Sequence, residues 1–248
     1  MKTARRCVLV SVTVAAFVAA MALGGCRNQP APESGLDYIE VVTGPAAADA
    51  PLPLLIAIHG LGDRPEAFCE FMKSGIRVRA RIICPRAPNV YGNGYSWFPP
   101  MRTLTSADRL AAAVEDAGDR VALLTRVLAR DARALGRPVL TGYSQGGMTS
   151  YYLAAMYSDL YAAVVPVAGM LPEPLRRREL RGQVVPIYGY HGKSDELVPY
   201  SEAKRTAEAL TERWPQTQFT GYDGVGHRLS SAMRRDLFDR LTLLLKLP

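Results

Sequence analysis

The chain alternates between two hydrophobic patterns: continuous apolar runs, and segments in which apolar residues recur at helical spacing. The run PLPLLIAIHG (51–60) has no charged residue before its closing His-Gly, which predicts a strand buried on both faces. From Thr105 to Leu135, apolar residues recur every three or four positions, which predicts one long helix or two helices joined at Gly118. The same patterns predict further strands over 36–42, 78–85, 137–143, 160–169, 183–192 and 217–224, and further helices over 64–75, 145–157, 198–214 and 231–247.

This alternation of strands and helices predicts the α/β class, with a mostly parallel central sheet and helices on both of its faces. The pattern shows no repeat and no second domain, so residues 36–248 are predicted to form a single domain. A chain of 248 residues with 48% apolar and 21% charged residues has the composition of an ordinary globular protein. Sheets of this kind bind ligands at the carboxyl ends of their strands, so we expect functional side chains there.

The N-terminus has its own pattern, in which basic residues are followed by an apolar run and then by small residues. This pattern predicts a secretory signal peptide over 1–25, because the apolar run is short for a membrane span of about 20 residues. LGGC (23–26) resembles the bacterial lipobox. The resemblance implies a lipid on Cys26, a membrane anchor and a place in the bacterial cell envelope, the outer membrane in a Gram-negative cell. Residues 26–35 are then expected to form a flexible tether; an uncleaved anchor and an ordinary cleaved signal are the alternatives.

The positive charge of the chain belongs partly to this signal. The formal net charge is +7, and the signal contains three basic and no acidic residues, so the mature chain carries 7 − 3 = +4. The densest basic stretch, LRRRELRGQ (175–183), is expected to be a solvated helix face or loop rather than a site for phosphate or anionic lipid. No zinc-type cysteine spacing and no RNA-binding aromatic motif accompanies the charge. Neither a metal nor a nucleic-acid partner is therefore expected.

Two cysteines remain once Cys7 leaves with the signal and Cys26 takes the lipid. In an oxidising envelope Cys69 and Cys84 can pair, but the sequence does not tell whether their Cα atoms come within about 7 Å. A disulfide and two buried free thiols both remain open.

The stretch GYSQG (142–146) is the first candidate for chemistry, because it lies between a β-rich VLT and a helix-like MTSYYLAAMY. A G-x-S-x-G pattern in that context predicts a sharp strand-to-helix turn that exposes the hydroxyl of Ser144. Glycines two residues away on each side avoid collisions at such a turn. The amides at the start of the following helix favour a developing negative charge, so Ser144 is predicted to be a nucleophile.

A serine hydroxyl needs a base, normally histidine, and the chain contains three histidines. In proteins with this turn the order along the chain is serine, acid, histidine. His59 precedes Ser144, and His191 lies in a predicted strand before any plausible acid loop. His227 follows the last predicted strand on a glycine-rich loop, so it is the predicted base.

The acid that orients the base must lie between Ser144 and His227 at the carboxyl end of a strand. Asp195, in HGKSDELVP, meets both conditions, with Glu196 as the adjacent alternative, while Asp223 is too near His227 in sequence to orient it easily. A buried carboxylate there would hold the imidazole tautomer and stabilise the imidazolium.

An oxyanion hole needs two backbone donors. The amide of Gln145, directly after the nucleophile, is the first candidate, and the amide of Leu61, after the strand that ends in IHGLGD, is the second. His59 and His191 are expected to be structural.

Four motifs, HGLGDRPEAF, GYSQGGMTS, HGKSDELVPY and GVGH, together resemble the phospholipase/carboxylesterase group of α/β-hydrolases, which includes the acyl-protein thioesterases. The resemblance runs from about Leu52 to the C-terminus. It implies a single α/β-hydrolase domain that cleaves carboxylic esters or thioesters without a metal or organic cofactor, with Ser144, Asp195 and His227 as the triad. The chain departs from this family in two places. YSWFPP has prolines where these enzymes usually have the acidic residue of a WFD-like stretch, and the chain carries a lipoprotein-like signal.

The acyl pocket is predicted to be lined by aromatic residues and a methionine of the long loop YGNGYSWFPPM (91–101), with a surface-packed loop as the alternative. The predicted lining residues are Tyr91, Tyr95, Trp97, Phe98 and Met101. Between the strands that end near Val167 and begin near Val184, the chain is too short for a large lid. An open site predicts activity on small or medium soluble esters without interfacial activation.

Three alternatives to an esterase remain open, of which peptidase activity is a minor one. An acyltransferase with the same triad would differ only in the acceptor that outcompetes water, and a non-catalytic, ligand-binding lipoprotein would keep the fold without the reaction. The oligomeric state cannot be predicted from these patterns.

Overall fold

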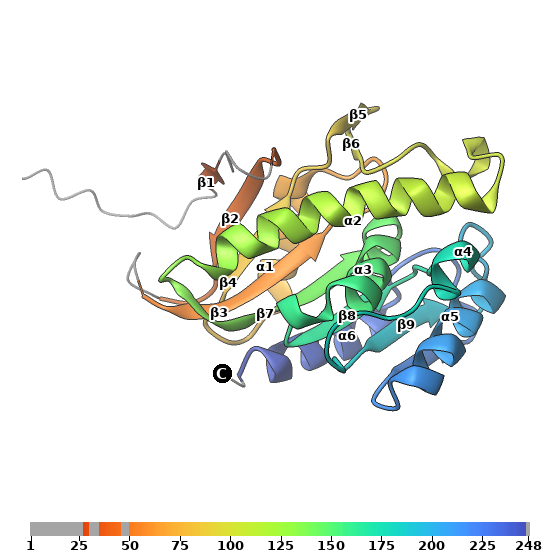
Figure 1. Ribbon diagram of the computed structural model, residues 1–248. Coiled ribbons are helices and arrows are strands. Elements are labelled where there is room, and N and C mark those ends of the chain that lie inside the picture. The colour runs from red at the N-terminus through yellow and green to blue at the C-terminus, as the bar shows by residue number, and fades with distance from the viewer. Residues whose placement is uncertain (1–26, 30–34, 46–49, 247–248) are drawn as a thin grey trace, which may run out of the picture.

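The computed structural model describes residues 27–29, 35–45 and 50–246 (Figure 1). The predicted signal peptide and Cys26 lie outside these residues. In the described chain, the main sheet has eight strands in the order β1-β2-β4-β3-β7-β8-β9-β10. In that order, the strands are β1 (Arg27–Gln29), β2 (Tyr38–Val42), β4 (Arg81–Pro85), β3 (Leu52–Ile58), β7 (Ala134–Tyr143), β8 (Ala163–Val167), β9 (Tyr188–Gly192) and β10 (Gln218–Tyr222).

The pairing of these strands confirms the predicted mostly parallel sheet. The strands from β4 to β10 are parallel to their neighbours, and only β1 and β2 at one edge are antiparallel. All five residues of β8 and six of the seven residues of β3 are buried, as the continuous apolar runs predict for strands covered on both faces.

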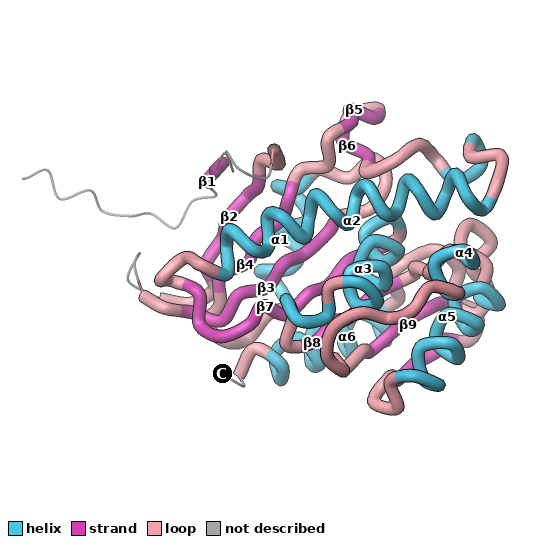
Figure 2. Tube along the Cα trace, in the orientation of Figure 1, coloured by secondary structure: helices cyan, strands magenta, loops and turns pink. Residues whose placement is uncertain are grey.

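Helices cover both faces of the sheet, as Figure 2 shows in cyan against magenta. They are α1 (Pro65–Gly75), α2 (Ala107–Ala129), α3 (Gln145–Met156), α4 (Glu173–Arg176), α5 (Tyr200–Arg213) and α6 (Ser231–Leu244). One apolar cluster joins α2, α3 and α5 to one face, and a second joins α1 and α6 to the other. The carboxyl ends of the parallel strands therefore lie between two helical layers.

Helix α2 is continuous through Gly118, which decides between the one-helix and two-helix predictions. A Cβ atom on Gly118 would lie 2.1 Å from the ring of Tyr152 on α3, so the glycine permits close helix packing rather than a joint.

Three segments differ from their predictions. The helix predicted through Leu135 ends at Ala129, and β7 already begins at Ala134, because a turn closed by a hydrogen bond from Ala134 N–H to the Asp131 carbonyl, at 2.8 Å, separates them.

Within the expected tether, β1 pairs with β2, because β2 would otherwise leave its outer backbone groups unpaired at the sheet edge. Within the expected long loop, β5 (Asn89–Tyr91) and β6 (Gly94–Ser96) form a hairpin. The hairpin packs on the loop after β3, because Gly62 N–H donates to the Tyr95 carbonyl at 2.8 Å and Tyr95 N–H donates to the Asp63 carbonyl at 3.0 Å.

A disulfide joins Cys69 on α1 to Cys84 on β4, with the two Cα atoms 5.7 Å apart. The sequence left a disulfide and two free thiols open, and the structure has the disulfide. It links α1, the helix that follows β3, to β4, the strand beside β3. Among the described residues, no helix combines the length and apolar character that a membrane span needs.

Candidate active site

Ser144 occupies the turn between β7 and α3, with a backbone φ of 56° that non-glycine residues rarely adopt. The flanking glycines explain how the turn fits. A Cβ atom on Gly142 would lie 2.2 Å from the Gly146 carbonyl oxygen, and one on Gly146 would lie 2.0 Å from the Ile58 carbonyl oxygen. Both obstacles are backbone atoms, so the turn has no room for a side chain at either position.

Gly146→Ala is expected to lower the free energy of unfolding by at least about 2 kcal/mol and to remove activity, because the β3–α3 packing must open to admit the methyl group. Gly92→Ala is the matched control. Gly92 has a φ of 57° but no atom within 4 Å of its Cβ position, so only a backbone cost of about 1 kcal/mol is expected there. Urea unfolding measures both; equal effects of the two substitutions would contradict the packing explanation.

The structure brings the three predicted polar residues together in one hydrogen-bonded series. His227 Nε2 lies 2.8 Å from Ser144 Oγ, and His227 Nδ1 lies 2.7 Å from Asp195 Oδ2. The Asp195 side chain is fully buried and that of His227 is 13% exposed. The residues come from the turn after β7, the loop after β9 and the loop after β10. A carboxylate that accepts from Nδ1–H leaves Nε2 free to accept the serine proton.

Asp195 is surrounded by donors. Its Oδ1 accepts from the backbone N–H groups of Leu197, at 3.0 Å, and Val198, at 2.9 Å, and His191 Nε2 lies 3.3 Å from Oδ2. Burial alone would raise the pKa of Asp195. Hydrogen bonds from His191, His227 and the Val198 amide outweigh burial and hold this pKa well below its usual value of 3.8. The carboxylate is therefore ionised throughout the neutral range.

The depressed pKa of Asp195 has a consequence for stability. A carboxyl group with a lowered folded-state pKa stabilises the fold fully above its unfolded value, about 3.9, and loses that contribution as the pH falls toward the folded-state pKa. We expect the unfolding free energy of the wild type to fall relative to that of Asp195→Asn as the pH drops from about 5 to about 3. Urea titrations across this range measure it, and a difference that stays flat to about pH 3 would contradict the assignment.

The two predicted oxyanion donors border the same space as Ser144. Gln145 is the first residue of α3, so its amide has no acceptor within the helix. Leu61 follows β3 in a loop that is held by a hydrogen bond from Gly60 N–H to Asp63 Oδ2, at 3.0 Å. In the described part of the chain, the Leu61 amide donates to no protein acceptor.

The remaining histidines are buried, as expected of structural residues. His59 Nε2 accepts from Ala87 N–H at 3.3 Å, which leaves Nδ1 to donate to the Gly60 carbonyl at 2.8 Å. His191 Nε2 lies 2.8 Å from the Val198 carbonyl, in addition to its contact with Asp195. His59 thus braces the loop that carries Leu61, and His191 braces the acid loop.

Beside Ser144 is a cavity of about 500 Å³, here called the apolar cavity. Most of its lining is aliphatic, with Arg102 and Glu196 as its charged members. Its wall includes Leu61, Met101, Met148, Leu197, Val198 and Pro199. The predictions missed Met148 and Leu197–Pro199 as lining residues. Their places in the sequence could have indicated them, because Met148 lies one helical turn after Ser144 and Leu197–Pro199 follow Asp195 closely.

Of the five predicted lining residues, only Met101 lies on the wall of this cavity, so the prediction was wrong for the other four. Trp97 and Phe98 are each 2% exposed and belong to the core. Tyr95 packs under Arg86, whose Cζ lies 5.3 Å from the ring centroid, and Tyr91 projects from the hairpin.

The segment around Trp97 and Phe98 nevertheless supports the site through the buried side chain of Gln145. Its Oε1 accepts from Trp97 N–H at 3.0 Å, and its Nε2 donates to the Phe98 carbonyl at 2.7 Å. Trp97 Nε1–H donates to the His59 carbonyl at 3.0 Å. These bonds tie the first residue of α3 to the loop after β3. The sequence motif specified a residue after the serine but gave no signal of this role.

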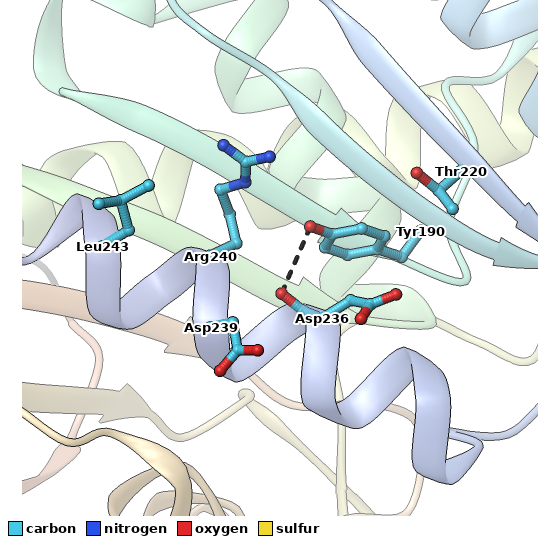
Figure 3. A pocket seen from close by; sticks show the side chains of 6 residues that line it. All are labelled: Tyr190, Thr220, Asp236, Asp239, Arg240 and Leu243. Atoms are coloured by element: carbon cyan, nitrogen blue, oxygen red, sulfur yellow. Dashed lines mark hydrogen bonds between the residues drawn. The ribbon is translucent and has the colours of Figure 1, made fainter.

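A separate hollow of about 370 Å³ lies between β9, β10 and α6 (Figure 3). There the Tyr190 hydroxyl donates to the Asp236 carbonyl oxygen at 3.5 Å. The side chains labelled in Figure 3 include no histidine, so this hollow has no nucleophile–histidine pair. Among the described residues, no group of three or more His, Cys, Asp or Glu side chains is arranged to hold a metal ion.

Comparisons with known proteins agree with this architecture. A curated relative, acyl-protein thioesterase 1 of Neurospora crassa, is 25% identical over 193 residues, which cover 70% of this chain and 79% of the relative. The solved structure of esterase PE8 has a TM-score of 0.68 at 22% identity and covers 82% of this chain and 99% of its own. Acyl-protein thioesterase 2 of Zea mays has a TM-score of 0.64 at 21% identity, covering 83% and 98%.

The family match is broader than any of these pairwise comparisons. Residues 38–245 match the sequence model of the Phospholipase/Carboxylesterase family, and this range spans the sheet from β2 to β10 and the helices around it. The chain therefore belongs to the phospholipase/carboxylesterase family, and it is a hydrolase of the esterase or thioesterase type.

Proposed function

We propose that this protein hydrolyses carboxylic esters, and thioesters of similar size, through an acyl-enzyme on Ser144. The observation that carries the proposal is the series of short contacts from Ser144 through His227 to the buried Asp195. Such a series activates a hydroxyl that is otherwise a poor nucleophile. A ligand-binding protein without catalysis has no need of it.

In the proposed reaction, His227 Nε2 takes the proton from Ser144 Oγ as the oxygen attacks the carbonyl carbon. The amides of Leu61 and Gln145 stabilise the oxyanion that forms. His227 then donates the proton to the leaving alcohol as the ester bond breaks. A water molecule, deprotonated by the same histidine, releases the acid and restores the serine. Asp195 keeps Nδ1 protonated and stabilises the imidazolium in both steps.

The apolar cavity supports small or medium acyl chains as the preferred substrates, because its volume of about 500 Å³ lies within the range of small-molecule sites. Only the short helix α4 forms between β8 and β9, which supports a site without a large lid. The test is hydrolysis of p-nitrophenyl esters, from acetate to palmitate, by protein lacking residues 1–26. We expect turnover that is fastest at short or medium chains. A sharp rise in rate above the solubility limit of the substrate would argue for a lid, and no turnover on any ester would reject the proposal.

The acyl-enzyme can also pass its acyl group to an alcohol other than water. Hydrolysis is preferred here because it needs no second organic substrate.

We further propose that a lipid on Cys26 anchors this enzyme in the bacterial cell envelope. The lipobox resemblance motivates the proposal, and the Cys69–Cys84 disulfide supports it, because disulfides persist mainly in oxidising compartments. Since β1 begins at Arg27, such an anchor would hold this edge of the sheet close to the membrane surface.

Cys26→Ala is expected to move the protein from the membrane fraction to the soluble or unprocessed fraction and to abolish incorporation of labelled palmitate. Cys7→Ala is the matched control, since Cys7 lies within the segment that would be removed. Fractionation and labelling in a bacterial host measure both effects. Equal labelling of the wild type and Cys26→Ala would contradict the anchor.

A further inference from the structure

A second cavity, of about 360 Å³, is lined in part by Tyr143 and Arg228, the sequence neighbours of Ser144 and His227. Its lining includes three arginines, one carboxylate and aromatic rings. We call it the arginine cavity; the residues that matter here are Arg64, Arg228, Arg234, Asp63, Phe71 and Tyr143. None of the groups that act in the proposed reaction lines this cavity.

The arginine cavity adjoins the reacting groups. Tyr143 directly precedes Ser144; its ring centroid lies 5.3 Å from that of His227, and its hydroxyl donates to the His227 carbonyl at 3.1 Å. A Cβ atom on Gly60 would lie 3.1 Å from both Asp63 Oδ2 and the Tyr143 ring, and 3.4 Å from Ser144 Cβ. Asp63 and Tyr143 of the arginine cavity therefore lie close to Ser144, the proposed nucleophile.

The two cavities lie toward opposite faces of the sheet. Met148 of the apolar cavity is on α3, whereas Phe71 and Arg234 of the arginine cavity are on α1 and α6. These helices pack on different faces. An ester whose carbonyl carbon lies at Ser144 has two halves to place, the acyl chain and the alcohol. The aliphatic wall suits the acyl chain, which leaves the arginine cavity for the alcohol.

The charge of the arginine cavity is unbalanced. The one carboxylate on its wall, Asp63, already accepts from Gly60 N–H. Arg228 makes no ion pair with any described residue, and the Arg234 guanidinium lies 5.4 Å from the Phe71 ring centroid. Arg64 has only a long contact to Glu66, at 3.9 Å. Guanidinium groups beside aromatic rings suit a planar group that carries a carboxylate or another anion.

We infer that the arginine cavity binds the leaving alcohol and selects esters whose alcohol part carries an anionic group. This inference rests on the proposed esterase function. When Ser144 Oγ attacks, the bond from the carbonyl carbon to the alcohol oxygen breaks, and His227 gives that oxygen its proton. The acyl group stays on Ser144 while the anionic alcohol leaves past Arg228, the residue after His227.

The test compares two esters with the same acyl chain, p-nitrophenyl butyrate and 3-carboxy-4-nitrophenyl butyrate. The measured quantity is the ratio of kcat/KM for the anionic ester to that for the neutral ester, after division by their rates with hydroxide. Because both rates come from one preparation, the ratio does not depend on how much of a variant folds. The variants are Arg228→Gln and Arg234→Gln. Arg137→Gln is the matched control. Arg137 is exposed near the amino end of β7, whereas Ser144 follows the carboxyl end of the same strand.

We expect the wild type to prefer the anionic ester and each of the two variants to lower the ratio about fivefold at low salt, the size of one exposed charge interaction. The preference should shrink at about 1 M salt, where the screening length is about 3 Å, and Arg137→Gln should leave the ratio unchanged. A ratio that is the same in the wild type and both variants would overturn the leaving-group site while leaving the esterase intact. Failure to hydrolyse either ester would overturn the proposed function and this inference together.

Discussion

Ser144→Ala is expected to lower kcat for p-nitrophenyl butyrate by at least about 10⁴-fold, because alanine has no hydroxyl to attack the carbonyl carbon. Among the described residues, the Ser144 side chain contributes a single hydrogen bond, to His227 Nε2, and alanine meets the same backbone constraint at a φ of 56°. The folded structure should therefore survive the substitution, with a melting temperature close to that of the wild type. Activity measured with several preparations, alongside thermal unfolding, tests this expectation.

Ser201→Ala is the control for that experiment. Ser201 is exposed on α5 and does not line the apolar cavity, so the variant should keep activity within about twofold, as surface substitutions usually do. If Ser144→Ala retained more than about 1% of the wild-type rate, a covalent mechanism on Ser144 would be wrong.

Asp195→Asn is expected to lower kcat by about 10³- to 10⁴-fold, for a reason that the geometry makes specific. Oδ1 accepts from two backbone N–H groups, so the asparagine oxygen will take that position and its NH₂ group will face His227 Nδ1. A donor there forces the imidazole proton onto Nε2, which then points at Ser144 Oγ and cannot accept its proton. The rate should fall while the binding of a short-chain ester changes little.

Asp223→Asn is the matched control for that substitution. Asp223 is 87% exposed and pairs with Lys193 at 2.9 Å, and such surface pairs contribute little. Its rate should stay within about twofold of the wild type. If Asp195→Asn were equally active, the acid would have to be another carboxylate, with Glu196 the nearest candidate in sequence.

The elements and residues that the sequence predicted best depend on local patterns or on order along the chain. The turn at Ser144 is a local motif, and the positions of Asp195 and His227 follow from their places after β9 and β10. Because parallel strands bring their carboxyl ends to one edge, residues far apart in sequence could be expected to meet.

The features that the sequence did not predict depend on how segments far apart in the sequence pack against one another. Whether Cys69 reaches Cys84 depends on how α1 lies against β4, which periodicity does not specify. Trp97 and Phe98 turn into the core because the β5–β6 hairpin binds the loop after β3 and Gln145 binds their backbone. Aromatic composition alone gave no indication of the direction in which these rings point.

The central claim is that Ser144 forms a covalent bond with substrates, and labelling with a fluorophosphonate probe tests it most directly. Protein lacking residues 1–26 is treated with the probe, digested and analysed by mass spectrometry, with Ser144→Ala alongside. We predict one adduct per chain, on the peptide that contains Ser144, and none in the variant. The absence of any adduct on the folded wild type, or an adduct on another residue that persists in Ser144→Ala, would contradict the claim.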